Sequence, residues 1–237
     1  MISTRGWFYF IPATGTPEKY LHRIESGALE HLPGMSFYYS TQAELRSCLE
    51  RLSGFKVAVQ YSPELAIISY LDHGMAQNLE RAGITLVSSA GLIQRTESLL
   101  DHEMIQSHEA AAGHLYGIVK TVWERICADF PVKTLSEGDV QSWIVKEFSG
   151  RGLETDHPPI VAAGAHSGNP HYAPENGGAP LKKGEVLQLD LWAKKPGGIY
   201  ADISWVGVLA DEVPPDVARV FSDVASARDG CIDFINS

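Results

Sequence analysis

The sequence predicts an α/β (α+β) protein of two domains, covering residues 1–98 and 99–237. In the first domain, short apolar runs alternate with helical segments, as they do in α/β units. In the second domain, an amphipathic helical pattern begins at Asp101, and alternating strand residues later flank a Pro-Gly-Gly turn. A chain of 237 residues is long enough to give two small domains real cores.

Composition and charge exclude several classes of function. The net charge of −10 argues against a nucleic acid or an anionic membrane as partner, because binding phosphate needs clustered Lys and Arg. No apolar run approaches the ~18–20 residues of a transmembrane helix, so we expect no membrane partner. The three cysteines are widely spaced and predict neither a disulfide framework nor a zinc motif. They are expected as buried thiols, which places the protein in the reducing cytoplasm.

The first domain is predicted to combine short strands with helices. Apolar runs predict strands at residues 7–11, 18–24, 55–60 and 84–88. Thr41 is a predicted N-cap for a helix that ends near Leu52, and a second helix lies around residues 73–82. This order of strands and helices is the α/β pattern.

The second domain opens with one long helix, because apolar residues keep a 3.6-residue period from Met104 to Phe130. His108 falls on the apolar face and is predicted to be a core residue with its hydrogen bonds satisfied. Thr134 and Glu137 fit a capping box that opens a second helix. A strand, a loop, a strand pair and a last helix then follow, at residues 159–163, 166–180, 186–208 and 215–236.

The strand pair carries two aspartates, Asp190 and Asp202, on either side of a predicted five-residue loop at residues 194–198. With the turn centred on Pro196, Asp190 faces Asp202 directly. Facing residues of an antiparallel pair have Cβ atoms about 4.5–5.5 Å apart, and like charges there are destabilising. The sequence therefore predicts two carboxylates held close together on one face of the sheet.

Three interpretations of this acid pair compete. The carboxylates could bind divalent metal ions, which oxygen ligands suit. They could form an acid/base pair at the spacing of retaining glycosidases, or lie on a solvated face without a role. The neighbouring Trp192, Tyr200 and Trp205 make the surroundings apolar, which raises the cost of an unpaired acid pair and favours the metal.

The loop before the hairpin, GAHSGNPHY, groups His166, Asn169, His171 and Tyr172. Loops on a rigid scaffold often carry site residues. A histidine there could orient a substrate carbonyl or relay a proton, since histidine titrates near neutral pH. The alternative is a polar surface loop without a role.

Three segments, PPIVAAGAHSGNPHYAP, KKGEVLQLDLWAK and GIYADISWVG, together resemble the Xaa-Pro aminopeptidase, prolidase and creatinase family, the pita-bread metallopeptidases. The resemblance covers most of residues 101–237. The segments TRGWFYFIPATGTPEKYLHRIE and KVAVQYSPE look like part of the amino-terminal domain of bacterial relatives. The resemblance implies a partial creatinase-type α/β domain followed by the first half of a pita-bread catalytic domain.

The same resemblance assigns roles to the candidate residues. Asp190 and Asp202 become ligands of a centre of two divalent metal ions, with manganese expected and cobalt or zinc as alternatives. His171 matches the family's substrate-contacting histidine, and Ser204 stands where the family often has a threonine. We expect Ser204 to contribute to substrate binding together with the loop residues His166, Asn169 and Tyr172.

The chain departs from the family pattern in its ligands. The family's site has three more, a histidine and two glutamates, and no histidine follows His171 here. The resemblance thus implies a chain truncated at both ends and inactive alone. The complete enzyme would cleave Xaa-Pro bonds in a proline-containing peptide, as an aminopeptidase, a dipeptidase or a creatinase-type C–N hydrolase. The alternative is a non-catalytic module that pairs with a partner through its unfinished sheet. An unfinished sheet also leads us to expect a homo-oligomer.

Overall fold

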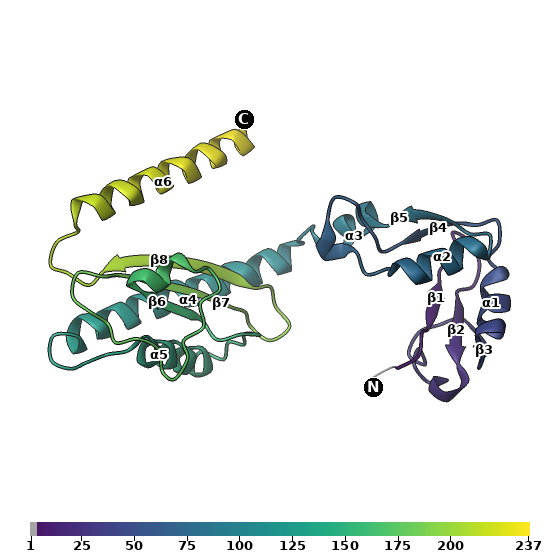
Figure 1. Cartoon of the computed structure of the whole chain (residues 1–237), viewed down its shortest axis with the longest axis horizontal. Helices are drawn as coiled ribbons and strands as arrows, with labels where there is room; N and C mark the ends of the chain where they lie inside the picture. The colour runs from purple at the N-terminus through teal and green to yellow at the C-terminus, as the bar shows by residue number, and fades with distance from the viewer. Residues whose placement is uncertain (1–3) are drawn as a thin grey trace. The chain divides into compact units, whose positions relative to one another are not determined.

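The computed structural model describes residues 4–237. The chain divides into two compact units, and the boundary in the sequence lies between Leu99 and Leu100 (Figure 1). Both units combine helices with sheets, which confirms the predicted α/β (α+β) class. No helix in the described part of the chain is long and apolar enough to cross a membrane.

In its described residues, the first unit holds two small sheets and three α-helices, with two short 3-10 helices at Arg23–Glu25 and Ala66–Ile68. One sheet has the order β1-β2-β3, from β1 (Phe8–Phe10), β2 (Glu18–His22) and β3 (Met35–Tyr39). The other pairs β4 (Lys56–Val59) with β5 (Thr85–Ser88) in parallel. The helices are α1 (Gln42–Glu50), α2 (His73–Arg81) and α3 (Ala90–Glu97). Thr41 caps α1 as predicted, because its side chain accepts a hydrogen bond from the Glu44 N–H.

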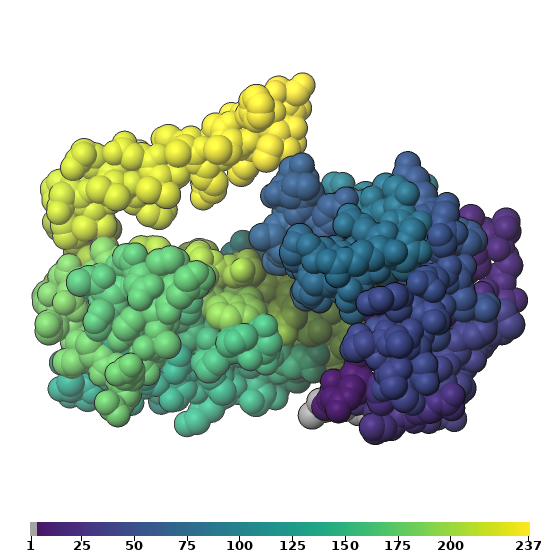
Figure 2. Space-filling model, turned by 45° about the vertical axis from the view of Figure 1, so that its right-hand side comes forward, coloured from purple at the N-terminus to yellow at the C-terminus, as the bar shows by residue number. Residues whose placement is uncertain are grey.

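The second unit packs two helices on one face of an antiparallel sheet with the order β6-β7-β8 (Figure 1). The helices are α4 (His102–Asp129) and α5 (Glu137–Gly150). The strands are β6 (Ile160–Ala163), β7 (Val186–Ala193) and β8 (Ala201–Val208). A last helix, α6 (Pro215–Asn236), has no buried residue; its side chains form the yellow rod in Figure 2.

Alternation along β7 separates the two faces of this sheet. Leu187, Leu189 and Leu191 are fully buried and join a core with residues of α4 and α5. Successive side chains of a strand point to opposite faces. Asp190 and Trp192 therefore lie on the face away from these helices, which we call the open face.

The cap of α5 differs from the prediction. The capping box is formed by Ser136 and Asp139, whose side chains each accept a hydrogen bond from the other's backbone N–H. The predicted pair of Thr134 and Glu137 is wrong, because Glu137 is the first residue of the helix and its side chain is fully buried. Sequence spacing alone did not distinguish these overlapping boxes.

His108 also differs from the prediction, since it is exposed and does not belong to the core. Its ring is nevertheless hydrogen-bonded, with Nδ1 2.7 Å from the carbonyl oxygen of Tyr200. The neighbouring Ser107 hydroxyl accepts from the Ile199 N–H at 3.2 Å. Both α4 side chains therefore bind backbone groups in the loop between β7 and β8.

Candidate metal centre

The register of the β7–β8 hairpin is shifted by two residues from the predicted one. Asp190 faces Ser204, and Asp202 faces Trp192. The strands end at Ala193 and resume at Ala201, so the loop is two residues longer than predicted. Ile199 and Tyr200 bind α4 and do not extend the ladder, which explains the longer loop.

A shift of two residues leaves every side chain on its own face, because the side-chain period of a strand is two. Asp190 and Asp202 therefore still share the open face, as diagonal neighbours. Such neighbours lie about 7–8 Å apart, farther than a directly opposed pair. The prediction of facing aspartates is wrong in register, while their placement on one face agrees with the structure.

The two aspartates have unequal surroundings. Partial burial of its carboxyl and, secondly, the negative charge of Asp190 raise the pKa of Asp202. The Ser204 hydroxyl donates a hydrogen bond to Asp190 Oδ1, so this predicted substrate-binding residue contacts the predicted metal ligand. A cation placed between the carboxylates would offset their mutual repulsion.

The donor set fits a metal only in part. Carboxylate oxygens suit manganese or magnesium, and both aspartates are accessible on the same face. Within residues 4–237, however, no group of three or more His, Cys, Asp or Glu side chains is placed to hold a metal ion. Asp190 and Asp202 supply two ligands, whereas hard cations usually take about six.

A cavity of about 460 Å³ is lined by His171, Tyr172 and Trp192 among others, and Trp192 pairs with Asp202 across the β7–β8 ladder. Ile160 also lines it, and this residue pairs with Asp190 across the β6–β7 ladder. The cavity therefore borders the open face at the position of Asp190. His171 therefore shares a pocket wall with Ile160 and Trp192, the ladder partners of Asp190 and Asp202.

Trp192 is held in this wall by an acid that the sequence analysis did not single out. Its indole Nε1 donates to Asp156 Oδ1 at 2.7 Å. This bond is the main cause that lowers the pKa of Asp156. Asp156 lies 36 residues before Trp192 in sequence, so no local pattern could have indicated the contact.

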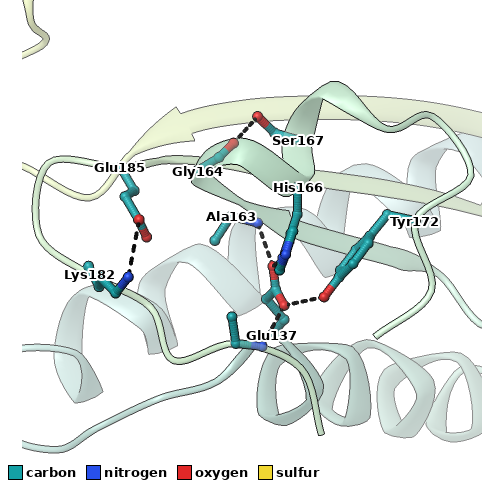
Figure 3. A network of polar contacts seen from close by, with 9 residues as sticks. Glu137, Ala163, Gly164, His166, Ser167, Tyr172, Lys182 and Glu185 are labelled. Carbon is teal, nitrogen blue, oxygen red and sulfur yellow. Dashed lines mark hydrogen bonds and ion pairs between the residues drawn. The ribbon is translucent and has the colours of Figure 1, made fainter. Parts of the chain in front are cut away.

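Beneath the loop, Glu137 forms a buried hydrogen-bond network with His166 and Tyr172 (Figure 3). Its Oε1 accepts from the Ala163 N–H and from His166 Nδ1, both at 2.8 Å. Its Oε2 accepts from the Tyr172 hydroxyl and the Ala179 N–H, both at 2.7 Å. The carboxylate is 0% exposed, and these four hydrogen bonds from the same chain use all of its acceptor sites.

These contacts decide the charge states of the network. Burial alone would raise the pKa of Glu137, but its four hydrogen-bond donors outweigh burial and lower it. Burial, with the bond to Glu137, raises the pKa of Tyr172 to about 12. An ionised Glu137 accepting from a neutral tyrosine is therefore the stable arrangement at neutral pH.

The predicted loop residues thus divide into two groups. His166 and Tyr172 bind Glu137, and their rings stack with centroids 4.3 Å apart. The Asn169 side chain accepts from the His171 N–H at 3.0 Å and shapes the turn before it. His171 lines the cavity, and its contact with substrate stays a prediction.

Comparison with solved structures shows the same fold in peptidases. A prolidase from Thermococcus sibiricus superposes with a TM-score of 0.64 at 19% identity, covering 96% of this chain and 60% of that one. The dipeptidase PepE from Mycobacterium ulcerans gives 0.63 at 18% identity, covering 90% and 56%. An X-Pro aminopeptidase from Thermotoga maritima gives 0.54 at 15% identity, covering 90% and 58%.

The chain spans less than two thirds of the length of these three solved proteins. A search of curated proteins found no match. A family model described as metallopeptidase family M24 matches residues 103–237, more than half of the chain. This match and the shared fold confirm the resemblance to the pita-bread metallopeptidases. The chain belongs to metallopeptidase family M24.

Proposed function

We propose that Asp190 and Asp202 are two ligands of a dinuclear metal centre that hydrolyses an Xaa-Pro peptide bond. The observation that carries this proposal is the placement of both carboxylates on the open face beside the cavity lined by His171. The solved structures of the same fold are prolidases, dipeptidases and an X-Pro aminopeptidase. Manganese is the metal we expect, with cobalt and zinc as alternatives.

Divalent ions at such a site polarise the scissile carbonyl and lower the pKa of a bound water. The residues of this chain would orient the partners of that reaction. The bond from Ser204 fixes one oxygen of Asp190 and leaves the other free. His171 would contact the substrate carbonyl, and the apolar wall with Ile160 and Trp192 would accept a prolyl ring.

We expect no turnover of peptide by this chain alone, because no group of three or more His, Cys, Asp or Glu side chains in residues 4–237 is placed to hold a metal ion. The test compares the chain with a fusion that adds, after Ser237, the carboxyl-terminal part of the Thermococcus sibiricus prolidase that this chain does not cover. With manganese, the fusion should hydrolyse the dipeptide Ala-Pro, and the chain should not. The Asp190→Asn, Asp202→Asn double variant of the fusion should lose this activity. A fusion that binds two ions per chain yet leaves Ala-Pro intact would contradict the proposal.

A second candidate function, an interaction module, is favoured by the surface of α6. This helix exposes Val220, Phe221, Val224, Ile232 and Phe234, each between 49% and 81% accessible. Strand β8 also forms one edge of its sheet and offers backbone groups to a further strand. A homo-oligomer or a partner chain would cover both features. Sedimentation equilibrium tests the homo-oligomer, and a monomer at every concentration would contradict self-association through these surfaces.

The proposed location is the cytoplasm. All three cysteines are free, as expected for a reducing compartment. Cys127 and Cys231 are exposed, against the prediction of buried thiols. Exposed thiols would be open to oxidation outside such a compartment.

A further inference from the structure

The loop that carries His171 is wrapped around a single buried carboxylate. We call residues 164–179 the His171 loop. Glu137 accepts hydrogen bonds from Ala163 just before the loop, His166 in its first turn, Tyr172 in its middle and Ala179 at its end (Figure 3). One side chain on α5 thus holds the residue before the loop and three positions along the loop.

Close backbone packing leaves this arrangement little freedom. The Gly138 N–H donates to the Gly177 carbonyl at 2.9 Å, and the Glu137 N–H donates to the Ala179 carbonyl at 3.0 Å. A Cβ atom on Gly138 would lie 2.5 Å from the Gly177 oxygen. A Cβ on Gly178 would lie 2.8 Å from the Glu137 side chain. The end of the loop therefore sits directly on the first turn of α5.

The tyrosine bound by Glu137 is the direct neighbour of His171. Both Tyr172 and His171 line the cavity beside Asp190. The His166 ring stacks on Tyr172, and Glu137 Oε1 holds that ring through Nδ1. The carboxylate thus fixes Tyr172 through its hydroxyl and supports its ring through His166. Because Tyr172 directly follows His171, a shift of the Tyr172 backbone out of this position would also move the backbone of His171.

We propose that Glu137 is a positioning residue, whose buried carboxylate holds the His171 loop in the conformation that places His171 on the cavity wall, at the face of the sheet that carries Asp190 and Asp202. If Glu137 served stability alone, none of its four hydrogen-bond donors would need to line the cavity. Here, one of the four donors belongs to the wall itself. The catalytic consequence rests on the proposed peptidase function, whereas the conformational statement does not.

The test uses the full chain without metal and the variant Glu137→Gln. Glu175→Gln is the matched control, because Glu175 is exposed on the same loop. The amide that Glu137→Gln introduces has a donor in place of one acceptor atom, so two of the four donors lose their acceptor. By NMR, Glu137→Gln should shift the imidazole signal of His171 and speed amide exchange at Ala179 by about tenfold or more. Glu175→Gln should leave both signals as in the wild type.

A role in folding alone predicts a different result. In that case Glu137→Gln would lower the melting temperature, while the His171 signal of the folded protein would stay at its wild-type position. That outcome overturns the inference. If Glu137→Gln fails to fold, Tyr172→Phe decides, because it removes one bond and keeps the carboxylate. Tyr172→Phe should move the His171 signal with the melting temperature nearly unchanged, and an unmoved signal contradicts the inference.

Activity separates this inference from the proposed function. A wild-type fusion that does not cleave Ala-Pro would contradict the peptidase proposal and leave the NMR result standing. A Glu137→Gln fusion with wild-type cleavage of Ala-Pro would overturn the positioning role and leave the peptidase proposal standing. A fall in cleavage in Glu137→Gln, with Glu175→Gln unaffected, is the expected result.

Discussion

In the second unit, Glu137 and Asp202 have opposite surroundings, which shift their pKa values in opposite directions. Glu137 is fully buried and accepts four hydrogen bonds from its own chain, which lower its pKa. Asp202 lies on the open face, where partial desolvation of its carboxyl and, secondly, the charge of Asp190 raise its pKa. The surroundings of Glu137 therefore favour its ionised form, and those of Asp202 disfavour its ionised form.

This difference separates a carboxylate that is satisfied by its own chain from two carboxylates that we propose to bind a metal ion. Buried charges are tolerated where hydrogen bonds satisfy them, as at Glu137. Two like charges held together, as at Asp190 and Asp202, reduce stability unless a cation joins them. The contrast predicts that the same kind of mutation will have opposite effects in the two regions.

The largest expected effect is at Glu137. Replacing Glu137 by alanine leaves four donors without their acceptor, and each buried unsatisfied group costs about 1–3 kcal/mol. Part of that cost is relieved by water, so we expect Glu137→Ala to lose about 3 kcal/mol or more of unfolding free energy. Urea unfolding measures it, and Glu175→Ala should stay within about 0.5 kcal/mol of the wild type. A loss below about 1 kcal/mol would show that the network is not a stabilising unit.

The second effect is the pH dependence of this contribution. The pKa of Glu137 is lower in the folded protein than the ordinary value of 4.5, so its stabilisation is fully present above pH 4.5. It is lost as pH falls below 4.5 through the folded pKa. The stability gap between the wild type and Glu137→Gln should therefore narrow on acidification. A gap that stays constant from about pH 7 to about pH 3 would contradict the lowered pKa.

The third effect is smaller and has the opposite sign. Since the pKa of Asp202 is raised above 3.8 in the folded protein, its ionised form costs stability at neutral pH. Without metal, Asp202→Asn should stabilise the chain by a few tenths of a kcal/mol at about pH 7, because solvent screens this exposed site. The gain should vanish below pH 3.8. Asp211→Asn is the control. Lys183 lowers the pKa of Asp211, so removing the Asp211 charge should bring no gain in stability.

The features that follow from local periodicity could be predicted from the sequence. The long helix α4 and the alternation of β7 are examples, because burial of one face repeats along each element. Strand β3 was missed because its side chains are mostly exposed and no alternating pattern marks it. β3 joins the sheet through parallel pairing with β2, and this contact between separate segments leaves no mark in the local sequence of β3.

Only one part of the site could be predicted from the sequence, namely which face of the strands each side chain lies on. Asp190 and Asp202 lie on the same face in either register, so a pattern of period two was enough to place them together. The register itself depends on Ser107 and His108, which lie 92 residues before the loop residues they bind. The role of Glu137 was missed because its donors lie 26 to 42 residues away, while a local capping motif offered a simpler interpretation.

Manganese binding tests most directly whether the open face of the hairpin binds divalent cations through Asp190 and Asp202, as we propose. Mn²⁺ is paramagnetic, so bound ions broaden the NMR signals of nearby groups. The indole signal of Trp192 and the amide of Ser204 should broaden first, with a dissociation constant of about a millimolar for so few ligands. The Asp190→Asn, Asp202→Asn double variant should lose this broadening. No broadening at the open face, or equal broadening in the double variant, would contradict the account.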